Sequence, residues 1–183
     1  MDGLTLTSRQ EEIRTARLLL RRVRPEDVMP VHAIMSDPES MQFWSTAAHA
    51  NLAETEAWFA SMVAADSAEQ SDEFILEHGG AVIGKIGIWR LPEIGFFLNR
   101  GFWGRGFATE ALAAYIGYVK GRGFTNLTAD VDPRNARCIR VLEKCGFTET
   151  GRKMATYVVD GRACDSVYLH LDLQTHWKRG SAR

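Results

Sequence analysis

The residues best suited to chemistry in this chain form a glycine-containing turn at residues 103–108, with the sequence WGRGFA. The apolar, β-favouring run at 93–99 predicts a strand before this turn, and apolar residues at helical spacing over 108–119 predict a helix after it. Glycines at alternate positions let a backbone approach a ligand closely, and the amides of a helix's first turn point outward. The pattern therefore favours phosphate binding, although a tight strand-to-helix connection without a ligand would use the same residue types.

Two common phosphate motifs do not fit the turn. A P-loop ends in Gly-Lys-Ser/Thr, and no such sequence follows here. A dinucleotide fingerprint needs a third glycine where this chain has Thr109, although Asp130 and Asp132 lie near the distance at which an acidic residue is expected. An oxidoreductase with an unusual nucleotide turn is therefore a remote alternative.

A second segment, residues 135–147, has the sequence NARCIRVLEKCGF. Taken together, the two segments resemble the GNAT superfamily of acyl-CoA-dependent N-acyltransferases. In that family an Arg/Gln-x-x-Gly-x-Gly/Ala pattern binds the CoA pyrophosphate, and an Asn-x-x-Ser/Ala helix that leads to Lys-x-Gly-Phe flanks the pantetheine. This chain has Trp103, Gly106 and Ala108 in the first pattern, so Trp replaces the usual Arg or Gln.

The Trp-containing turn is similar to that of the RimJ/RimL-like branch, which is named for ribosomal-protein alanine acetyltransferases. The opening signature of that branch, Thr-x-Arg-Leu-x-Leu-Arg and then a Pro/Glu/Asp step, is matched by TARLLLR at 15–21 and PED at 25–27. The resemblance covers nearly the whole chain and implies a single acetyltransferase domain over residues 1–183.

The resemblance implies an α/β (α+β) GNAT fold, with a mixed, mostly antiparallel central sheet that splays between its two parallel central strands and is flanked by helices. Hydrophobic periodicity and turn residues predict the elements along the chain. Strands are expected at 17–24 (an edge strand), 73–78, 81–89, 93–99, 127–131, 148–157 and 166–173, and helices at 26–35, 52–65, 105–120 and 136–145. A mobile polar loop is expected at 66–72, and a frayed tail from His176.

By resemblance, acetyl-CoA is the cosubstrate. The backbone of Phe96 and Leu98 is expected to bond the pantetheine, and amides around the glycine turn, that of Trp103 among them, the pyrophosphate. Asn135 is expected to contact the cofactor too, although Asn at a helix start also serves as a cap. The predicted cofactor-binding residues are Phe96, Phe97, Leu98, Trp103, Gly104, Arg105, Gly106, Phe107, Ala108, Thr109 and Asn135.

The GNAT resemblance also implies direct transfer of the acetyl group to an amine, which requires a general base and a proton for the leaving thiolate. Glu93 is the predicted base, because related enzymes carry a carboxylate on this strand; the alternative is a solvated strand-end acid after Pro92. Many relatives use a Tyr as the acid where this chain has Leu142. Cys138, which stands where other relatives have Ser, is the predicted acid, and a packed core cysteine is the alternative.

Phe43 and Trp44 are expected to wall the acceptor site, with Tyr157 joining them, and core packing is the alternative for the first two. By resemblance, the acceptor is expected to be a small-molecule amine or a protein N-terminal amine. A catalytically inactive acyl-CoA-binding protein of the same fold is the alternative function.

Composition limits the partners and the compartment. The 183 residues carry a net charge of −1, which gives no reason to expect nucleic acid or a membrane surface as partner. Three cysteines at unpatterned spacings and five scattered histidines predict neither disulfides nor a metal site. No signal sequence or membrane-length apolar run is found, so a cytoplasmic protein is expected, as a monomer or a homodimer.

Overall fold

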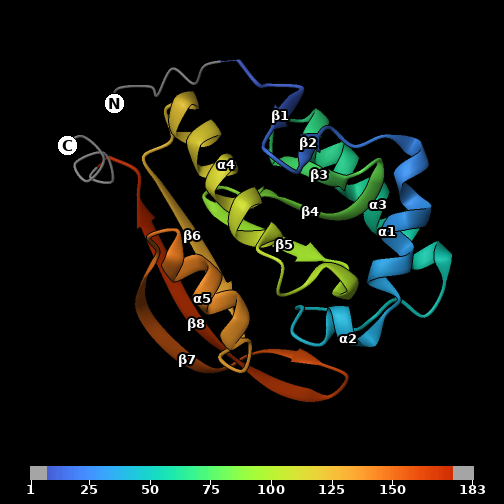
Figure 1. The fold of residues 1–183 in the computed structure, drawn as a ribbon. Helices are drawn as coiled ribbons and strands as arrows, with labels where there is room; N and C mark the ends of the chain where they lie inside the picture. Colours follow the sequence, from blue (N-terminus) through green and yellow to red (C-terminus); the bar gives the residue numbers. More distant parts are fainter. Residues whose placement is uncertain (1–7, 175–183) are drawn as a thin grey trace.

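The computed structural model describes residues 8–174, which form one eight-stranded mixed sheet with helices on both faces (Figure 1). The strand order is β1-β2-β3-β4-β5-β6-β8-β7. All neighbouring strands are antiparallel except β5 and β6, which are parallel. The strands are β1 (Glu12–Arg14), β2 (Leu19–Arg21), β3 (Asp72–His78), β4 (Ala81–Arg90), β5 (Glu93–Leu98), β6 (Asn126–Val131), β7 (Thr148–Val159) and β8 (Arg162–Asp172). The predicted fold class is confirmed.

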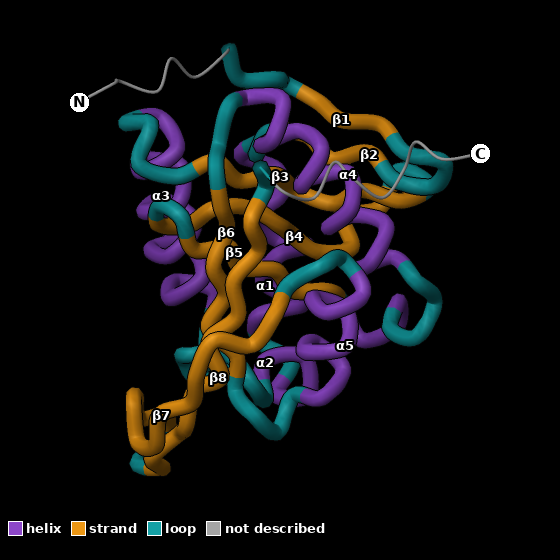
Figure 2. The backbone as a smooth tube through the Cα atoms, turned by 90° about the vertical axis from the view of Figure 1, so that its left-hand side faces the viewer, coloured by secondary structure: helices purple, strands orange, loops and turns teal. Residues whose placement is uncertain are grey.

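The helices divide between the two faces of the sheet (Figures 1 and 2). On one face α4 and α5 pack on the larger hydrophobic core, and on the other α1 and α3 pack on a smaller core. The helical elements are η1 (Pro25–Asp27), α1 (Val28–Met35), α2 (Pro38–Met41), α3 (Leu52–Ser67), η2 (Arg100–Phe102), α4 (Phe107–Arg122) and α5 (Ala136–Lys144). The short α2 was not predicted, and α4 begins two residues later than expected.

The hairpin between β3 and β4 turns at Gly79 and Gly80, as predicted. Both glycines have a positive φ, of 58° and 81°, which a two-residue hairpin turn of the primed type requires. Tyr115 of α4 is fully buried beneath this hairpin and ties the helix to it. Its hydroxyl donates to the Asp72 carbonyl at 2.7 Å and accepts from the Ile88 amide at 2.9 Å.

Two expectations near the N-terminal edge of the sheet are wrong. The strand predicted at 17–24 is shorter, and it is not the edge, because β1 pairs on its outer side. The segment 66–72 is not a solvated loop throughout: it contains the end of α3 and the start of β3, and Asp72 is buried. Arg22 and Arg122 pair with the Asp72 carboxylate at 2.8 and 2.5 Å, and these contacts offset the cost of its burial.

The sheet splays between β5 and β6. A single bridge, Glu93 to Thr128, joins the two strands, and the Thr128 amide donates to the Pro92 carbonyl at 3.1 Å. From Ile94 onward the edge of β5 that faces β6 has no strand partner. The sheet therefore opens toward the end of β5 at which the glycine turn begins.

Beyond the splay, α5 ends where it was predicted to, since Gly146 has a φ of 95° in the left-handed region typical of a helix end. The strands β7 and β8 form a long hairpin whose far end extends away from the body of the molecule (Figure 2). The predicted tail from His176 and the N-terminal opening lie outside the described residues.

Within residues 8–174 no helix is long and apolar enough to cross a membrane. The same residues contain no group of three or more His, Cys, Asp or Glu side chains that could hold a metal ion.

Candidate active site

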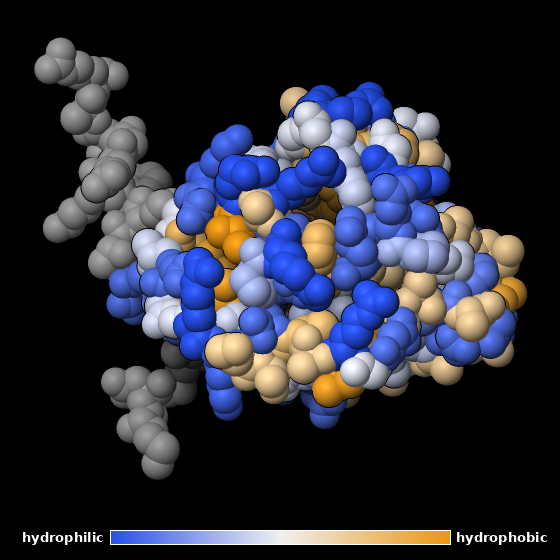
Figure 3. Space-filling model, turned by 90° about the horizontal axis from the view of Figure 1, so that it is seen from below, coloured by the Kyte–Doolittle hydropathy of each residue, from blue (hydrophilic) through white to orange (hydrophobic). Residues whose placement is uncertain are grey.

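A pocket of about 860 Å³ lies where the splayed sheet, the glycine turn, α5 and the segment around α2 meet. Seen from below, the surface is hollowed, with hydrophobic atoms deep in the hollow and hydrophilic side chains around it (Figure 3). The pocket holds thirteen of the sixteen predicted site residues: Phe43, Trp44, Phe96, Phe97, Leu98, Trp103, Gly104, Gly106, Phe107, Ala108, Thr109, Asn135 and Cys138. Three predicted residues, Glu93, Arg105 and Tyr157, are not part of its wall.

The glycine turn presents an open helix N-terminus to this pocket. Gly104 and Gly106 have φ values of 70° and 81°, which a residue with a side chain adopts only with strain. Gly106 is the N-cap of α4 and offers no side-chain cap, and the first intrahelical bond of the turn runs from the Glu110 amide to the Gly106 carbonyl at 3.0 Å. The amides of the preceding helical residues point out of the helix, where an anion is stabilised.

The Trp103 amide, predicted to bind the pyrophosphate, has a partner within the turn, and its role toward the cofactor stays a prediction. This amide donates to the Arg100 carbonyl at 3.1 Å, so it is already used inside the turn. The indole Nε1 of Trp103 donates to the Leu98 carbonyl at 2.9 Å, and the Arg137 guanidinium lies over the ring, 5.7 Å from its centroid. Trp103 therefore fixes the turn against β5, and its ring supports the Arg137 guanidinium at the pocket wall.

An arginine that the sequence analysis did not place in the site holds the turn from outside. The Arg17 guanidinium donates to the Arg105 carbonyl at 2.9 Å and to the Glu110 carboxylate at 2.7 Å. It also lies over the Phe107 ring, 4.3 Å from the centroid. Arg105 packs its guanidinium over the rings of Phe102 and Phe107, and its predicted binding of the cofactor stays a prediction.

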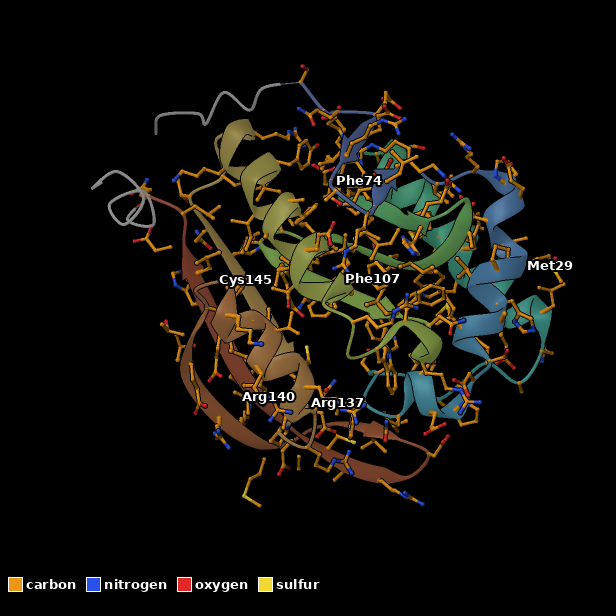
Figure 4. The ribbon with its side chains drawn as sticks, in the orientation of Figure 1. Met29, Phe74, Phe107, Arg137, Arg140 and Cys145 are labelled. Carbon is orange, nitrogen blue, oxygen red and sulfur yellow. The ribbon has the colours of Figure 1, made fainter. Side chains whose placement is uncertain are left out.

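The opposite wall of the pocket comes from α5. The Asn135 side chain accepts a hydrogen bond from the Cys138 amide at 3.0 Å, so the cap is present, and Asn135 also faces the pocket. Arg137 and Arg140 extend from the end of α5 that lies nearest α2 (Figure 4), and with Lys144 they line the pocket. These basic side chains give one wall a positive charge.

Cys138 lies in this wall but is poorly suited to donate a proton. Burial raises the pKa of its thiol to about 12, well above the reference value of about 8.5 for a cysteine. Cys138 therefore holds its proton more tightly than an ordinary thiol. Its position in the pocket agrees with the sequence analysis, while its role as an acid stays a prediction.

Aromatic side chains form the entrance on the side of α1 and α3. Trp44 packs edge-on against Phe97, with centroids 5.5 Å apart. Phe43 lies beneath the Arg134 guanidinium, 5.9 Å from the ring centroid, and Arg134 is paired with Asp132. Tyr157 lies near Asp132, and burial and the Asp132 carboxylate raise the pKa of its hydroxyl to about 12.

Two carboxylates stand at the base of the splay on the same side as Trp44. Glu93 accepts a hydrogen bond from Arg90 at 2.9 Å and is separated from the pocket wall. Asp130, two residues beyond the bridging Thr128, has no ion-pair partner within residues 8–174. Burial raises the pKa of Asp130 and the charge of Glu93 raises it further, while a hydrogen bond with Ser166 acts to lower it. The sequence analysis named Asp130 only as an acid near a failed dinucleotide motif.

Comparison with known proteins supports a common fold and family. Residues 17–148 match the family model described as the acetyltransferase (GNAT) domain. The chain is 29% identical over 172 residues to an uncharacterized N-acetyltransferase, p20, of Bacillus licheniformis, covering 87% of this chain and 94% of that protein. It is 32% identical over 130 residues to the uncharacterized protein YkkB of Bacillus subtilis (strain 168), covering 69% of this chain and 73% of that protein.

Solved structures share the same architecture at lower sequence identity. The spermidine N-acetyltransferase of Vibrio cholerae, solved in complex with CoA and spermine, superposes with a TM-score of 0.76 at 18% identity, covering 87% of this chain and 98% of that one. An acetyltransferase of Salmonella typhimurium that modifies the N-terminal serine of ribosomal protein L7/L12 gives a TM-score of 0.80 at 17% identity, covering 88% and 99%. At these identities the likeness shows the fold.

Proposed function

The chain belongs to the GNAT acetyltransferase family, and on that premise we propose that it transfers the acetyl group of acetyl-CoA directly to a primary amine, with both substrates bound together. The observation that carries this proposal is the pocket itself. An open helix N-terminus, a half-paired strand and a basic helix face meet in it. Bound acetyl-CoA supplies an acetyl group that is activated as a thioester.

The residues of the pocket fit the chemical parts of this cosubstrate. The amides of Phe107, Ala108 and Thr109 at the start of α4 face phosphate oxygens, and the positive φ of Gly104 and Gly106 brings the backbone close to them. The side chains of α5 offset the remaining phosphate charge. The unpaired edge of β5, from Phe96 to Leu98, offers backbone groups to the amides of pantetheine.

The reaction requires a proton to leave the amine, a nitrogen–carbon bond to form as the carbon–sulfur bond breaks, and a proton to reach the sulfur. One of the two carboxylates where the sheet opens takes the first proton, either Glu93, the predicted base, or Asp130, whose pKa is raised. The predicted donor of the second proton is Cys138 in the opposite wall, although its raised pKa favours solvent in that role.

The acceptor is a primary amine, of a small molecule or of a protein N-terminus. Similar folds serve both kinds, since the Vibrio cholerae relative was solved with spermine and the Salmonella typhimurium relative modifies an N-terminal serine. A cytoplasmic location and a monomeric or homodimeric state remain predictions.

The phosphate-binding role of the glycine turn is tested by Gly104→Asp. This change adds a carboxylate where phosphates are expected, and an added side chain meets no atom within 4 Å in the protein itself. We expect calorimetric CoA affinity to fall by about 100-fold or more, since like charges meet at a desolvated site. Gly161→Asp is the matched control, because Gly161 has a φ of 74° and equally open surroundings at the far end of the β7–β8 hairpin.

The result separates the proposed function from its alternatives. Undiminished CoA affinity in a folded Gly104→Asp variant would overturn the assignment of the turn. Tight CoA binding by the unaltered protein, with no thiol release from acetyl-CoA over a panel of amines, would favour the catalytically inactive binding protein. Binding of NAD in place of CoA would favour the oxidoreductase.

A further inference from the structure

Two histidines meet at one buried hydroxyl on the face of the sheet that α1 and α3 cover. The Nδ1 atom of His32, on α1, lies 2.7 Å from the Thr55 hydroxyl, and the Nδ1 atom of His49 lies 2.8 Å from the same oxygen. Thr55, on α3, is fully buried, whereas both imidazoles are half-buried. The cluster therefore ties α1, α3 and the segment 42–51 between α2 and α3 (the wall segment) to a single atom.

The wall segment carries aromatic residues of the pocket near one end and His49 near the other. Phe43 and Trp44 line the pocket, and Trp44 also packs on the smaller core. Near the other end the His49 amide donates to the Met35 carbonyl at 2.9 Å. The segment itself contains no helix or strand, so the contacts of His49 help to fix the position of the two aromatic rings.

The hydroxyl can satisfy both imidazoles only while at least one of them is neutral. A hydroxyl donates one hydrogen bond and accepts others, and a neutral imidazole has one donor and one acceptor nitrogen. The Thr55 hydroxyl therefore donates to the Nδ1 atom of one histidine and accepts from that of the other. The histidine that donates can take up a proton at Nε2 and keep its contact. A proton on the other histidine, by contrast, occupies the Nδ1 lone pair that the hydroxyl needs.

A second positive charge on the cluster is also opposed electrostatically. The two Nδ1 atoms lie no farther apart than the sum of their distances to the hydroxyl oxygen, about 5.5 Å. His32 is the only titratable side chain of α1, and Glu54 is the carboxylate of α3 whose charge acts on His49. Burial lowers the pKa of His49, Glu54 acts to raise it, and the charge of His32 acts to lower it again.

The other charged groups around the wall segment are already matched. Asp37 and Glu39, beside and within α2, both pair with Arg100. The Glu54 carboxylate accepts a hydrogen bond from the Ala50 amide at 2.9 Å. The wall segment has no titratable side chain besides that of His49. The geometry thus accommodates one positive charge on the cluster and opposes a second.

We propose that His32, Thr55 and His49 position the acceptor wall of the pocket, and that the second proton taken up by the two histidines releases it, so that acceptor binding weakens in weakly acidic solution. None of the three belongs to the pocket wall, so they are positioning residues and not catalytic ones. The effect on the acceptor rests on the proposed acetyl transfer, whereas the position of the wall segment can be measured without it.

Fluorine NMR of protein labelled with 5-fluorotryptophan follows the wall segment directly. Trp44 lies in this segment and Trp103 in the glycine turn, and their signals are assigned from Trp44→Phe and Trp103→Phe. Between about pH 8 and pH 5 the protein without CoA should show one transition of the Trp44 signal. Its midpoint should lie below 6.5, the pKa of an ordinary histidine. The Trp103 signal is the reference and should show no such transition.

Variants of the cluster separate it from other groups that titrate in acid. In His49→Gln a neutral group remains at the hydroxyl but cannot take up the second proton, so the Trp44 transition should disappear. Thr55→Ser retains the hydroxyl and should keep the transition, whereas Thr55→Val should give the acid-state signal already at about pH 8. Asp130→Asn is the matched control: it removes a carboxyl whose pKa is raised by burial, and the transition should persist.

The effect on function is measured as the KM for the acceptor, with spermine and with alaninamide as one amine of each kind. The ratio of KM in the unaltered enzyme to KM in His49→Gln cancels the titration of the amine and of Asp130. This ratio should rise by about 10-fold or more from pH 8 to pH 5, because two charges this close near a protein surface repel strongly enough for such a shift.

The outcomes separate this proposal from the proposed function. A Trp44 signal without a transition, or a transition that His49→Gln leaves unchanged, overturns the proposal even where acetyl transfer is fast. A constant KM ratio overturns the link to acceptor binding. If no amine is acetylated although CoA binds, the proposed function fails, and the Trp44 signal still decides whether the cluster positions the wall segment.

Discussion

Arg17 and Glu110 join the N-terminal segment to the first turn of α4, with the Arg17 Nε donating to the Glu110 carboxylate at 2.7 Å and the Arg17 amide donating to the same group at 3.0 Å. The same guanidinium holds the Arg105 carbonyl between the two glycines of the turn. Arg17 therefore sets the shape of a loop whose function depends on its backbone.

We expect Arg17→Met to raise the KM for acetyl-CoA by about 10-fold while kcat changes less than about 2-fold, because a hydrogen bond to a charged group contributes about 1.5–3 kcal/mol. Arg14→Met is the control, since Arg14 forms a comparable ion pair with Glu12 at the exposed edge of the sheet. Steady-state kinetics over a range of acetyl-CoA concentrations give both constants. A KM within 2-fold of the unaltered enzyme would remove Arg17 from the binding of the cosubstrate.

The two carboxylates at the splay are distinguished by the pH profile of kcat/KM. Burial and the Glu93 charge raise the pKa of Asp130, so as pH falls through this raised pKa the carboxylate takes up a proton and activity is lost. Asp130→Asn should lower kcat by about 100-fold and remove this acidic limb. Glu93→Gln removes a negative charge next to Asp130, so the limb should shift to lower pH. Loss of the limb in Glu93→Gln alone would instead make Glu93 the base, as the sequence predicts.

For Cys138 we expect turnover to survive loss of the thiol. Because burial raises its pKa to about 12, Cys138→Ala should keep kcat within about 3-fold of the unaltered enzyme. Cys138→Ser should lower stability by about 1–3 kcal/mol, if the new hydroxyl finds no partner in the pocket wall. Turnover and urea denaturation of both variants decide the matter. A slow Ala variant that is rescued by Ser would establish Cys138 as the acid.

The Asp72 cluster predicts how stability depends on pH. Burial acts to raise the pKa of Asp72, but its contacts with Arg22, Tyr118 and Arg122 outweigh burial and lower it. A carboxyl with a lowered pKa in the folded protein contributes stability above its unfolded pKa of about 3.9, and this contribution is lost as pH falls through the lower folded value.

Asp72→Asn should therefore reduce the free energy of unfolding by about 3–5 kcal/mol at pH 7, since it leaves buried arginines without their counter-charge. The difference from the unaltered protein should shrink in acid, where Asp72 itself becomes neutral. Urea denaturation at several pH values measures both effects. A constant difference at all pH values would contradict the electrostatic origin.

The parts of the fold that depend on local signals were predicted closely. A glycine pair fixes the β3–β4 hairpin, and apolar residues at helical spacing over 108–119 identify α4. The prediction that Asp72 lies in a mobile polar loop was wrong, because its partners Arg22 and Arg122 are each 50 residues away in sequence. No local pattern shows that a polar stretch will supply one buried carboxylate.

The candidate site divides in the same way. The glycine turn can be recognised because its function requires particular backbone conformations, which limit the residue types. The contact between Arg17 and Glu110 spans 93 residues, and the packing of Trp44 edge-on against Phe97 joins two elements that lie far apart in the chain. Neither leaves a signal in a short stretch of sequence. Asp130 can be recognised as a candidate base only from its position beside the opening of the sheet, which the sequence does not show.

The single bridge between β5 and β6 also has a consequence for synthesis on the ribosome. The strands on one side of this bridge, β1 to β5, all precede those on the other side, β6 to β8, in the chain. The strands β1 to β5 and helix α4 therefore emerge from the ribosome before any strand of the second half. Chains are made from the N-terminus at about 5–20 residues per second, and early segments begin to fold first. A nascent chain thus has its glycine turn, but no complete pocket, until Asn135 and the rest of α5 have left the tunnel. The growing protein will therefore gain its affinity for CoA late, after most of its core has formed.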